Sequence, residues 1–310
     1  MKIDAYAHIL PSNYLSEFRK RAPVPTEFRE ANNLAVSDIN VRLRLMDRYP
    51  DVMQIITMSL PPLESIVSPG DAAELAIIGN NDLAGLVDHY PDKFAGAVAT
   101  LPMNNIEAAL EEADRAINRL QMKGVQICAN HNAEPLNSPN YRRLYEKMAH
   151  YNLPIWIHPY SIHGKYEPLF GWPFETASAM KSIVEAGIFN DFPDLKFITH
   201  HSGGMVPFLE SRVKWMMPME MRDRQRLKDP LAHFKKFYTD TALYGSTPGL
   251  MCAYHFFGPE HLLFGTDAPL GPGYGVTMET VDSIYRMNIA DEDKQRILRG
   301  NVTNLLQLPL

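Results

Sequence analysis

Eight short apolar segments, spaced along the whole 310-residue chain, constrain the fold more than any other feature of the sequence. Each is rich in β-branched, aromatic or aliphatic residues, which is typical of strands buried on both faces of a parallel sheet. The segments occupy 2–8, 52–58, 94–103, 124–131, 154–160, 196–202, 236–243 and 262–269.

Longer segments with the period of an amphipathic helix separate these strands. In 105–120 the apolar positions recur at spacings of three and four and form one stripe, made of Ile106, Leu110, Ala113, Ile117 and Leu120. Similar patterns occupy 71–90, 139–151, 175–190 and 278–287. Eight strands alternating with helices predict a (β/α)8 TIM barrel, an α/β fold, with 1–310 as a single domain. A doubly wound open sheet is less favoured, because no Gly-x-Gly-x-x-Gly pattern follows the first strand.

Two stretches are longer than ordinary loops. Residues 10–40 follow the first strand, and we expect them to form a small cap over the mouth of the barrel. Residues 210–235 follow the sixth strand and mix Trp215 and several methionines with alternating charges. Soft apolar residues beside arginines suit a contact between subunits, so this segment predicts a homo-oligomer, a dimer or larger. A long amphipathic helix packed on its own barrel is the alternative.

Composition narrows the environment and the partners. A formal net charge of -6, without a dominant basic stripe, argues against nucleic acid as a partner. The two cysteines, Cys128 and Cys252, lack CxxC spacing, which indicates a reducing compartment and no disulfide framework. No apolar stretch approaches the ~20 residues that span a bilayer, and the N-terminus lacks the pattern of a signal peptide. We therefore expect a cytoplasmic protein that binds a small molecule, without a nucleic-acid or membrane partner.

Histidines and an aspartate stand at the carboxyl ends of the predicted strands, where a barrel of this kind has its active site. His8 ends the first strand, His158 the fifth, His200 and His201 the sixth, and Asp267 the eighth. Two further polar residues lie in the fourth and seventh strands: His131 and Asp240. A single such histidine is ordinarily structural, but an apolar barrel has no reason to gather so many polar groups without partners. Convergent imidazoles and a carboxylate suit a Zn²⁺, Mn²⁺ or Fe²⁺ ion with one open position.

At these residues the sequence resembles the amidohydrolase superfamily, and within it the amidohydrolase-related branch that contains aminocarboxymuconate-semialdehyde decarboxylase and γ-resorcylate decarboxylase. The resemblance covers essentially the whole chain. It rests on KIDAYAHILP at the start, RLRLMDRYPDVMQIITMS at 42–59, LPIWIHP at 153–159, DLKFITHHSGGMVPFLESR at 194–212, HLLFGTDAP at 261–269 and ILRGNVTNLLQL at 297–308. It implies a TIM barrel of the metal-dependent hydrolase type with one divalent metal ion, zinc first and manganese or iron as alternatives.

The resemblance also implies roles for particular residues. His8 in the first strand and His158 in WIHP match metal ligands. Asp267 in GTD matches an aspartate that binds metal and can move protons. His201 aligns with the family pattern His-x-Gly-Gly and is the expected catalytic acid or base. His200 falls at a position that is usually small or apolar in relatives.

Two arginines imply a substrate that carries a carboxylate. Arg212, eleven residues after His201, matches an arginine that grips a substrate carboxylate in the decarboxylases, sometimes from a neighbouring subunit. Arg42 sits where a second such arginine can occur. A guanidinium matches a carboxylate with two parallel hydrogen bonds, although an arginine on a barrel loop more often forms a surface ion pair.

The loop after the fifth strand, 160–174, supplies aromatic residues. Phe170 and Trp172 are candidates for the walls of a pocket for a planar substrate, and the alternative is that they simply pack the loop. His163 in the same loop is a candidate for proton transfer, with an ordinary solvent-exposed histidine as the alternative.

Tyr6 departs from the family pattern, because relatives have His or Glu there to complete the coordination of the metal. A free phenol has a pKa near ~10, so Tyr6 binds metal only if the ion stabilises the phenolate. Tyr6 is therefore a phenolate ligand, or it lines the substrate pocket while His8, His158 and Asp267 hold the ion, or metal affinity is lost. Three protein ligands plus water is a working arrangement for zinc. We therefore expect a metal site with an altered ligand rather than a site that has lost its metal.

The predicted function is metal-dependent, non-oxidative decarboxylation of a small unsaturated or aromatic carboxylic acid. In that reaction the metal holds an oxygen of the acid, and Asp267 or His201 delivers a proton to carbon as CO₂ leaves. A hydrolase of an amide, lactone or C–C bond would use the same residues with water bound to the metal. A non-catalytic barrel that binds a small acid is the third hypothesis, and Tyr6 is its only support.

Overall fold

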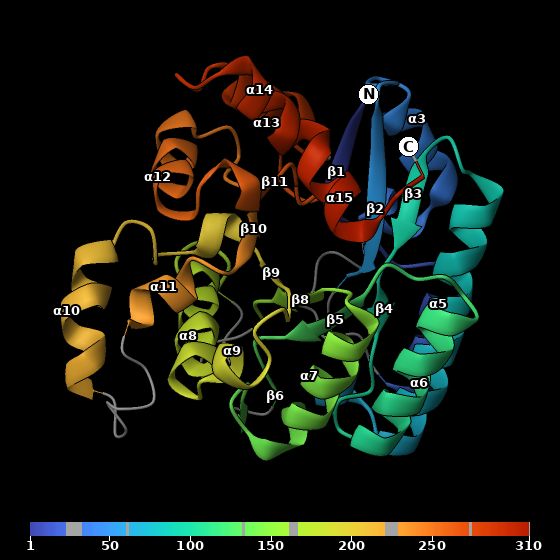
Figure 1. The fold of residues 1–310 in the computed structure, drawn as a ribbon. Coiled ribbons are helices and arrows are strands. Elements are labelled where there is room, and N and C mark those ends of the chain that lie inside the picture. The colour runs from blue at the N-terminus through green and yellow to red at the C-terminus, as the bar shows by residue number, and fades with distance from the viewer. Residues whose placement is uncertain are drawn as a thin grey trace.

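The computed structural model describes residues 1–22, 33–59, 62–131, 134–160, 167–220, 229–272 and 275–309, and of residues 131 and 134 it describes the main chain only. In this part of the chain, parallel strands alternate with helices from one end to the other. Figure 1 shows the strands at the centre of the molecule and the longer helices around the outside.

All eight predicted strands are present. They are β1 (Lys2–Ile9), β2 (Val52–Met58), β3 (Phe94–Ala97) with β4 (Ala99–Thr100), β5 (Val125–Cys128), β8 (Ile155–His158), β9 (Phe197–Thr199), β10 (Tyr238–Asp240) and β11 (Leu262–Leu263). Neighbours pair in parallel in the orders β1–β2–β3 and β4–β5–β8–β9–β10–β11. A short antiparallel hairpin, β6 (Asn130–His131) and β7 (Glu134–Pro135), follows β5.

Two joints close these strands into a barrel. At the first, β3 runs directly into β4: Val98 N donates to Ile56 O (3.0 Å), and the next residue donates to Gly124 O (3.0 Å). At the second, the chain after β11 pairs with β1, where His8 N donates to Ala268 O (2.6 Å). The predicted (β/α)8 TIM barrel is confirmed, and its closure places the first strand beside the last.

The predicted helices are present as α5 (Pro69–His89), α6 (Ile106–Asn118), α7 (Pro139–Tyr151), α8 (Gly171–Glu185) and α13 (Thr277–Tyr285). The helix predicted over 175–190 is in fact two, α8 and α9 (Ile188–Asp191). Gly187 between them has φ of 68°, a left-handed conformation that ends a helix. Along the residues that the structure describes, no helix is both long and apolar enough to cross a membrane.

The other helical elements are mostly short; the last three follow the final barrel strand, and the others connect barrel strands. They are α1 (Ser12–Arg21), α2 (Leu34–Ser37), α3 (Ile39–Met46), α4 (Leu63–Ile66), α10 (Glu210–Glu220), α11 (Pro230–Phe234), α12 (Thr247–Phe257), α14 (Asp291–Gln295), a π-helical turn (Arg296–Gly300) and α15 (Asn301–Leu306). Single 3-10 turns cover His201–Gly203 and Pro259–His261.

An apolar cluster fills the barrel away from the histidines. It contains Ile3, Ala5, Ile55, Val98, Trp156, Ile198 and Leu263, and Val302, Leu305 and Leu306 at the C-terminal end pack onto it. Trp156 is fully buried, and its indole Nε1 donates to Ala5 O (3.1 Å). Gly124 makes room for it, because a Cβ there would lie 2.7 Å from the Trp156 ring. This packing holds β1 and β8, both of which carry a histidine toward the other end of the barrel.

The first long insertion begins with a helix on the side of the barrel. α1 packs against α5, where Tyr14 N donates to Asp82 Oδ2 (2.9 Å). Residues 23–32 lie outside the described part of the chain, so the cap over 10–40 stays a prediction.

The second insertion contains α10, which lies at the left edge of the molecule in Figure 1, with α11 between it and α8. Lys181 of α8 and Glu220 of α10 form an ion pair (3.2 Å). Residues 221–228 lie outside the described part, so the contact segment over 210–235 also stays a prediction.

Candidate active site

The candidate active site lies at the carboxyl ends of β1, β8 and β9 and in the segment after β11. His8, His158 and Asp267 come together here from separate strands, and all three side chains are buried. Barrel closure joins them, because Asp267 N donates to Tyr6 O (2.9 Å). Asp267 has φ of 65°, a left-handed conformation that non-glycine residues adopt at some energetic cost, often at functional sites.

His8 and Asp267 face each other at ion-pair distance. His8 Nε2 lies 3.1 Å from Asp267 Oδ1, yet both atoms are buried and have no hydrogen-bond partner. The other nitrogen of His8, Nδ1, lies 2.9 Å from Thr57 Oγ1, and that hydroxyl can itself donate to Ala7 O (3.5 Å). In the tautomer that carries the proton on Nδ1, this hydroxyl accepts from Nδ1 and Nε2 carries the lone pair. A nitrogen lone pair facing a carboxylate oxygen is the arrangement that a cation between them stabilises.

The charge on Asp267 is favoured by its neighbours. Burial opposes ionisation of this carboxyl, but contact with His8, and then the charges that His8, His201 and His158 carry when protonated, outweigh burial and hold the pKa of Asp267 below its usual value of 3.8. Asp267 is therefore a carboxylate at physiological pH, which is the form that binds a metal ion.

His158 ends β8 with its ring centre 5.1 Å from that of His8. Its Nδ1 is hydrogen bonded to the Pro159 carbonyl, so its Nε2 is also the unprotonated nitrogen. Burial, and then the nearby His8 and His200, hold the pKa of His158 well below 6.5. The ring is therefore neutral at physiological pH, as a metal ligand has to be.

The two histidines after β9 have different surroundings. His201, the predicted acid or base, has a buried Nδ1 without a partner, and its ring stacks on Trp172 with centres 5.9 Å apart. His200 is fully buried and bonds through Nδ1 to Asp240 Oδ2 (2.8 Å). The sequence assigned neither His200 nor Asp240 a role. The sequence feature that could have identified them is that both are polar residues at the ends of adjacent apolar strands.

Tyr6 occupies the middle of this cluster. The centre of its ring lies 3.6 Å from that of His200 and 4.6 Å from that of His8, and its hydroxyl is buried without a hydrogen-bond partner. Burial, and then the charges of Asp267 and Asp240, raise the pKa of Tyr6 well above 10. The phenol therefore stays protonated beside these carboxylates unless a bound cation offsets their charge.

The donor atoms of the cluster suit a divalent cation, although they do not form a complete coordination site. Among the residues that the structure describes, no three His, Cys, Asp or Glu side chains already surround a single metal position. The cluster nevertheless gathers buried polar atoms without protein partners: Tyr6 Oη, His8 Nε2, His200 Nε2, His201 Nδ1 and Asp267 Oδ1. Such atoms are costly to bury, and imidazole nitrogen and carboxylate oxygen are donors that Zn²⁺, Mn²⁺ and Fe²⁺ share.

The two predicted substrate arginines have other surroundings in this chain. Arg42 is buried: its Nε and Nη2 donate to Gln54 Oε1 (3.1 and 2.9 Å), and Nη2 also donates to Ala268 O (3.3 Å). These donors are not available to a substrate carboxylate. Arg212 is exposed on α10 and lines a surface groove between α10 and α8. A substrate contact by either arginine stays a prediction.

The two aromatic residues predicted to line the pocket, Trp172 and Phe170, have different positions in the structure. Trp172, in the first turn of α8, is buried, donates through Nε1 to Tyr160 O (2.9 Å) and packs beside the ring of His158. Phe170 is 75% exposed. The structure therefore brings Trp172 to the cluster and leaves Phe170 at the surface. His163 and the side chain of His131 lie outside the described residues.

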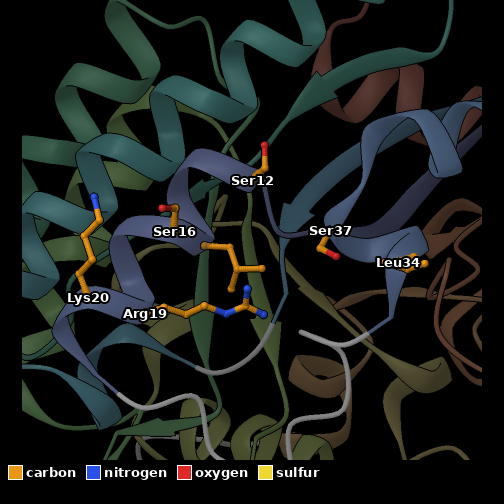
Figure 2. Close-up of a pocket in the computed structure, with 7 residues that line it drawn as sticks. Ser12, Ser16, Arg19, Lys20, Leu34 and Ser37 are labelled. Atoms are coloured by element: carbon orange, nitrogen blue, oxygen red, sulfur yellow. The ribbon is translucent and has the colours of Figure 1, made fainter.

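A cavity of about 570 Å³ lies between α1 and α2 (Figure 2). It is lined by Ser12, Leu15, Ser16, Arg19, Lys20, Leu34 and Ser37. Figure 2 shows Arg19 extending toward the Ser37 side, while Lys20 points away. None of the clustered histidines lines it, so this cavity is separate from the candidate site.

Comparisons with known proteins agree with the fold. The family model described as Amidohydrolase matches residues 3–308. The 2-amino-3-carboxymuconate-6-semialdehyde decarboxylase of Dictyostelium discoideum is 27% identical, with 99% of this chain and 92% of that protein covered. The γ-resorcylate decarboxylase of Polaromonas sp. is 27% identical, with 86% of each chain covered.

A solved structure extends the comparison to three dimensions. The dihydroxybenzoic acid decarboxylase of Polaromonas sp., solved with bound manganese and the inhibitor 2-nitroresorcinol, has a TM-score of 0.82 at 23% identity. The alignment covers 99% of this chain and 96% of that one. The expected fold and the resemblance drawn from the motifs are both confirmed: the chain belongs to the amidohydrolase family.

Proposed function

We propose that this protein is a metal-dependent lyase that removes CO₂, without oxidation, from a small aromatic or unsaturated carboxylic acid. The observation that carries the proposal is the buried pair of unpartnered atoms, His8 Nε2 and Asp267 Oδ1, 3.1 Å apart at the carboxyl end of the barrel. The relatives support the reaction class, because those described above are named as decarboxylases.

His8, His158 and Asp267 are the residues that would hold one divalent ion, with Tyr6 beside them. Manganese is the ion to test first, because a similar structure carries it. Zinc and iron accept the same donors. When bound, the ion supplies positive charge that holds a substrate oxygen and stabilises negative charge on it.

The proton that replaces CO₂ has to come from the chain. Loss of CO₂ breaks a carbon–carbon bond and leaves an electron pair on the substrate carbon, which accepts a proton. The low pKa of Asp267 keeps it ionised in the free protein, so it serves better as a ligand than as the first proton donor. His201 is 7% exposed and has an unpartnered Nδ1, and we assign the proton transfer to it.

Burial of the site favours decarboxylation over hydrolysis. Five of its side chains are each at most 2% exposed: Tyr6, His8, His158, His200 and Asp267. An enclosed site strengthens electrostatic interactions and limits side reactions with water, whereas a hydrolase has to admit water as a reactant.

Arg212 is our candidate for the substrate carboxylate, and it would act in a homo-oligomer. It is exposed in its own chain and lines a groove with Lys181 and Met216. It would serve a neighbouring chain if α10 lies at the contact between subunits. We place the protein in the cytoplasm, where its two free thiols, Cys128 and Cys252, would stay reduced.

The test is CO₂ release by protein loaded with Mn²⁺, Zn²⁺ or Fe²⁺, measured on a panel of hydroxybenzoic and muconate-like acids. We expect CO₂ and a product that carries one deuterium when the reaction runs in D₂O. His158→Ala should lose both the ion and the activity, whereas His255→Ala, at an exposed histidine on α12, should keep both. Hydrolysis of amides or lactones without CO₂ would make the protein a hydrolase. Failure to bind any of the three ions would leave a barrel that binds acids without turnover.

A further inference from the structure

His200 and Tyr6 are two unusual residues of this site, and the structure puts them in contact. Their rings stack with centres 3.6 Å apart and planes inclined by 15°. Tyr6 stands where a metal ligand is expected, and His200 stands where a small residue is expected. We propose that His200 is a ligand of the metal ion in this protein, in place of the ligand that Tyr6 does not provide. The proposal rests on the metal-dependent function proposed above.

The environment of His200 is that of a ligating histidine. The side chain is fully buried, and its Nε2 has no hydrogen-bond partner. Its Nδ1 bonds to Asp240 Oδ2 (2.8 Å). Metal-binding histidines ordinarily donate their second N–H to a carboxylate or carbonyl, which fixes the tautomer and orients the ring. With the proton on Nδ1, His200 presents a lone pair on Nε2.

Asp240 is itself held in place. Its Oδ1 accepts hydrogen bonds from Ala242 N (3.0 Å) and Ser202 N (3.3 Å). Gly265 lies between Asp240 and Tyr6, and a Cβ there would meet Asp240 Cβ at 2.8 Å and Tyr6 Cβ at 3.0 Å. Glycine at 265 therefore permits the close approach of these two side chains, which positions His200 from both sides.

His200 also lies at a suitable distance from His158, one of the predicted ligands. The ring centre of His158 lies 5.1 Å from that of His8 and 5.6 Å from that of His200. Imidazoles that bind one ion through Nε2 at about 2.1 Å have ring centres roughly 5–6 Å apart. All three rings use Nδ1 for a protein contact and leave Nε2 for a ligand. The set of three imidazoles with Asp267 makes four protein ligands, without Tyr6.

A purely structural histidine is the rival explanation. In that role, Asp240 and the Tyr6 ring would hold His200 in the core. A core role leaves Nε2 buried with no partner, which costs free energy. Ligation to the ion satisfies that atom.

The test counts the imidazole nitrogens bound to Mn²⁺ by pulsed electron paramagnetic resonance on protein with ¹⁵N-labelled histidine. We expect three in the wild type, two in His200→Gln and three in His201→Gln, which removes the neighbouring histidine as a matched control. Competition with a chelator should show Mn²⁺ affinity falling at least tenfold in His200→Gln. The double variant Tyr6→His/His200→Gln should recover much of that loss.

The outcomes separate this proposal from the proposed function. Two bound imidazoles in the wild type, or unchanged Mn²⁺ affinity in His200→Gln, would overturn the role of His200 and leave the lyase proposal standing. A wild type that binds no ion would overturn both. The count on the wild type decides the matter even if a variant does not fold.

Discussion

The charge of Arg42 suggests that it binds a substrate carboxylate, whereas its buried surroundings suggest that it stabilises the fold. Its guanidinium donates to Gln54 Oε1, and Gln54 Nε2 in turn donates to Asp4 Oδ2 (3.4 Å). Removing one member of a buried polar network leaves the others unpaired, so we expect Arg42→Met to lower the free energy of unfolding by about 3–5 kcal/mol. Arg44→Met, at an exposed position on the same helix, should change it little. Urea unfolding measures both; a tenfold rise in KM with stability unchanged would instead make Arg42 a substrate contact.

Glu64 is a buried carboxyl that sequence reasoning did not identify, beside Gln126 and Cys128 at the end of β5. Burial raises its pKa from 4.5 to about 7. Between these values the folded state keeps the proton that the unfolded state loses, so stability falls as pH rises from 4.5 to 7. This change in protonation lowers the free energy of unfolding by an amount on the order of 3 kcal/mol. We expect Glu64→Gln to lack this decrease when urea unfolding is measured from pH 4 to 8. If the free energy of unfolding decreases equally in both proteins, the decrease belongs to Asp4 and Asp240, whose pKa values burial raises to about 6 and about 7.

At the scale of an element, α10 exposes apolar side chains that a helix of a monomer would ordinarily bury. Trp215 is 69% exposed and Met219 is 66% exposed, and Phe208 just before the helix is 83% exposed. Apolar residues grouped on one element are typical of a protein contact. We expect Trp215→Glu to convert an oligomer into monomers, measured by size-exclusion chromatography with light scattering. Met278→Glu, at a 47% exposed methionine on α13, should keep the oligomer; a monomeric wild type would remove the argument for Arg212 acting across subunits.

At the scale of the whole molecule, one ion would join both ends of the chain, because its predicted ligands lie on β1, on β8 and after β11. An ion that binds only the folded state stabilises it by about 2.7 kcal/mol at a hundredfold excess over Kd. For a chain of this length that corresponds to a rise in Tm of roughly 4 °C. We expect Mn²⁺ to raise the Tm of chelator-treated wild type, and Asp267→Asn to show no such rise. Equal behaviour of the two proteins in a thermal melt would count against the site.

Particular elements show how far local patterns reach. β2 occupies its predicted range, 52–58, because the apolar character of a buried strand depends on neighbouring residues alone. α8 and α9 show the limit: the apolar pattern continues across Gly187, but the left-handed backbone there divides the helix. Arg42 shows a second limit, since its charge is visible in the sequence and its partners, Gln54 and Ala268, are not.

The sequence by itself determined the barrel, the family and the candidate ligands His8, His158 and Asp267, because short-range periodicity and the order of a few motifs carry that information. Only the tertiary structure decided that Tyr6 stacks on His200 and that the Asp240 carboxylate is hydrogen bonded to His200 Nδ1. Tyr6 lies on β1, His200 directly after β9 and Asp240 at the end of β10, far apart in the chain. Asp240 meets His200 because β10 pairs with β9, and Tyr6 reaches them because the barrel closes its first strand onto its last; no local pattern records which side chains these arrangements bring together.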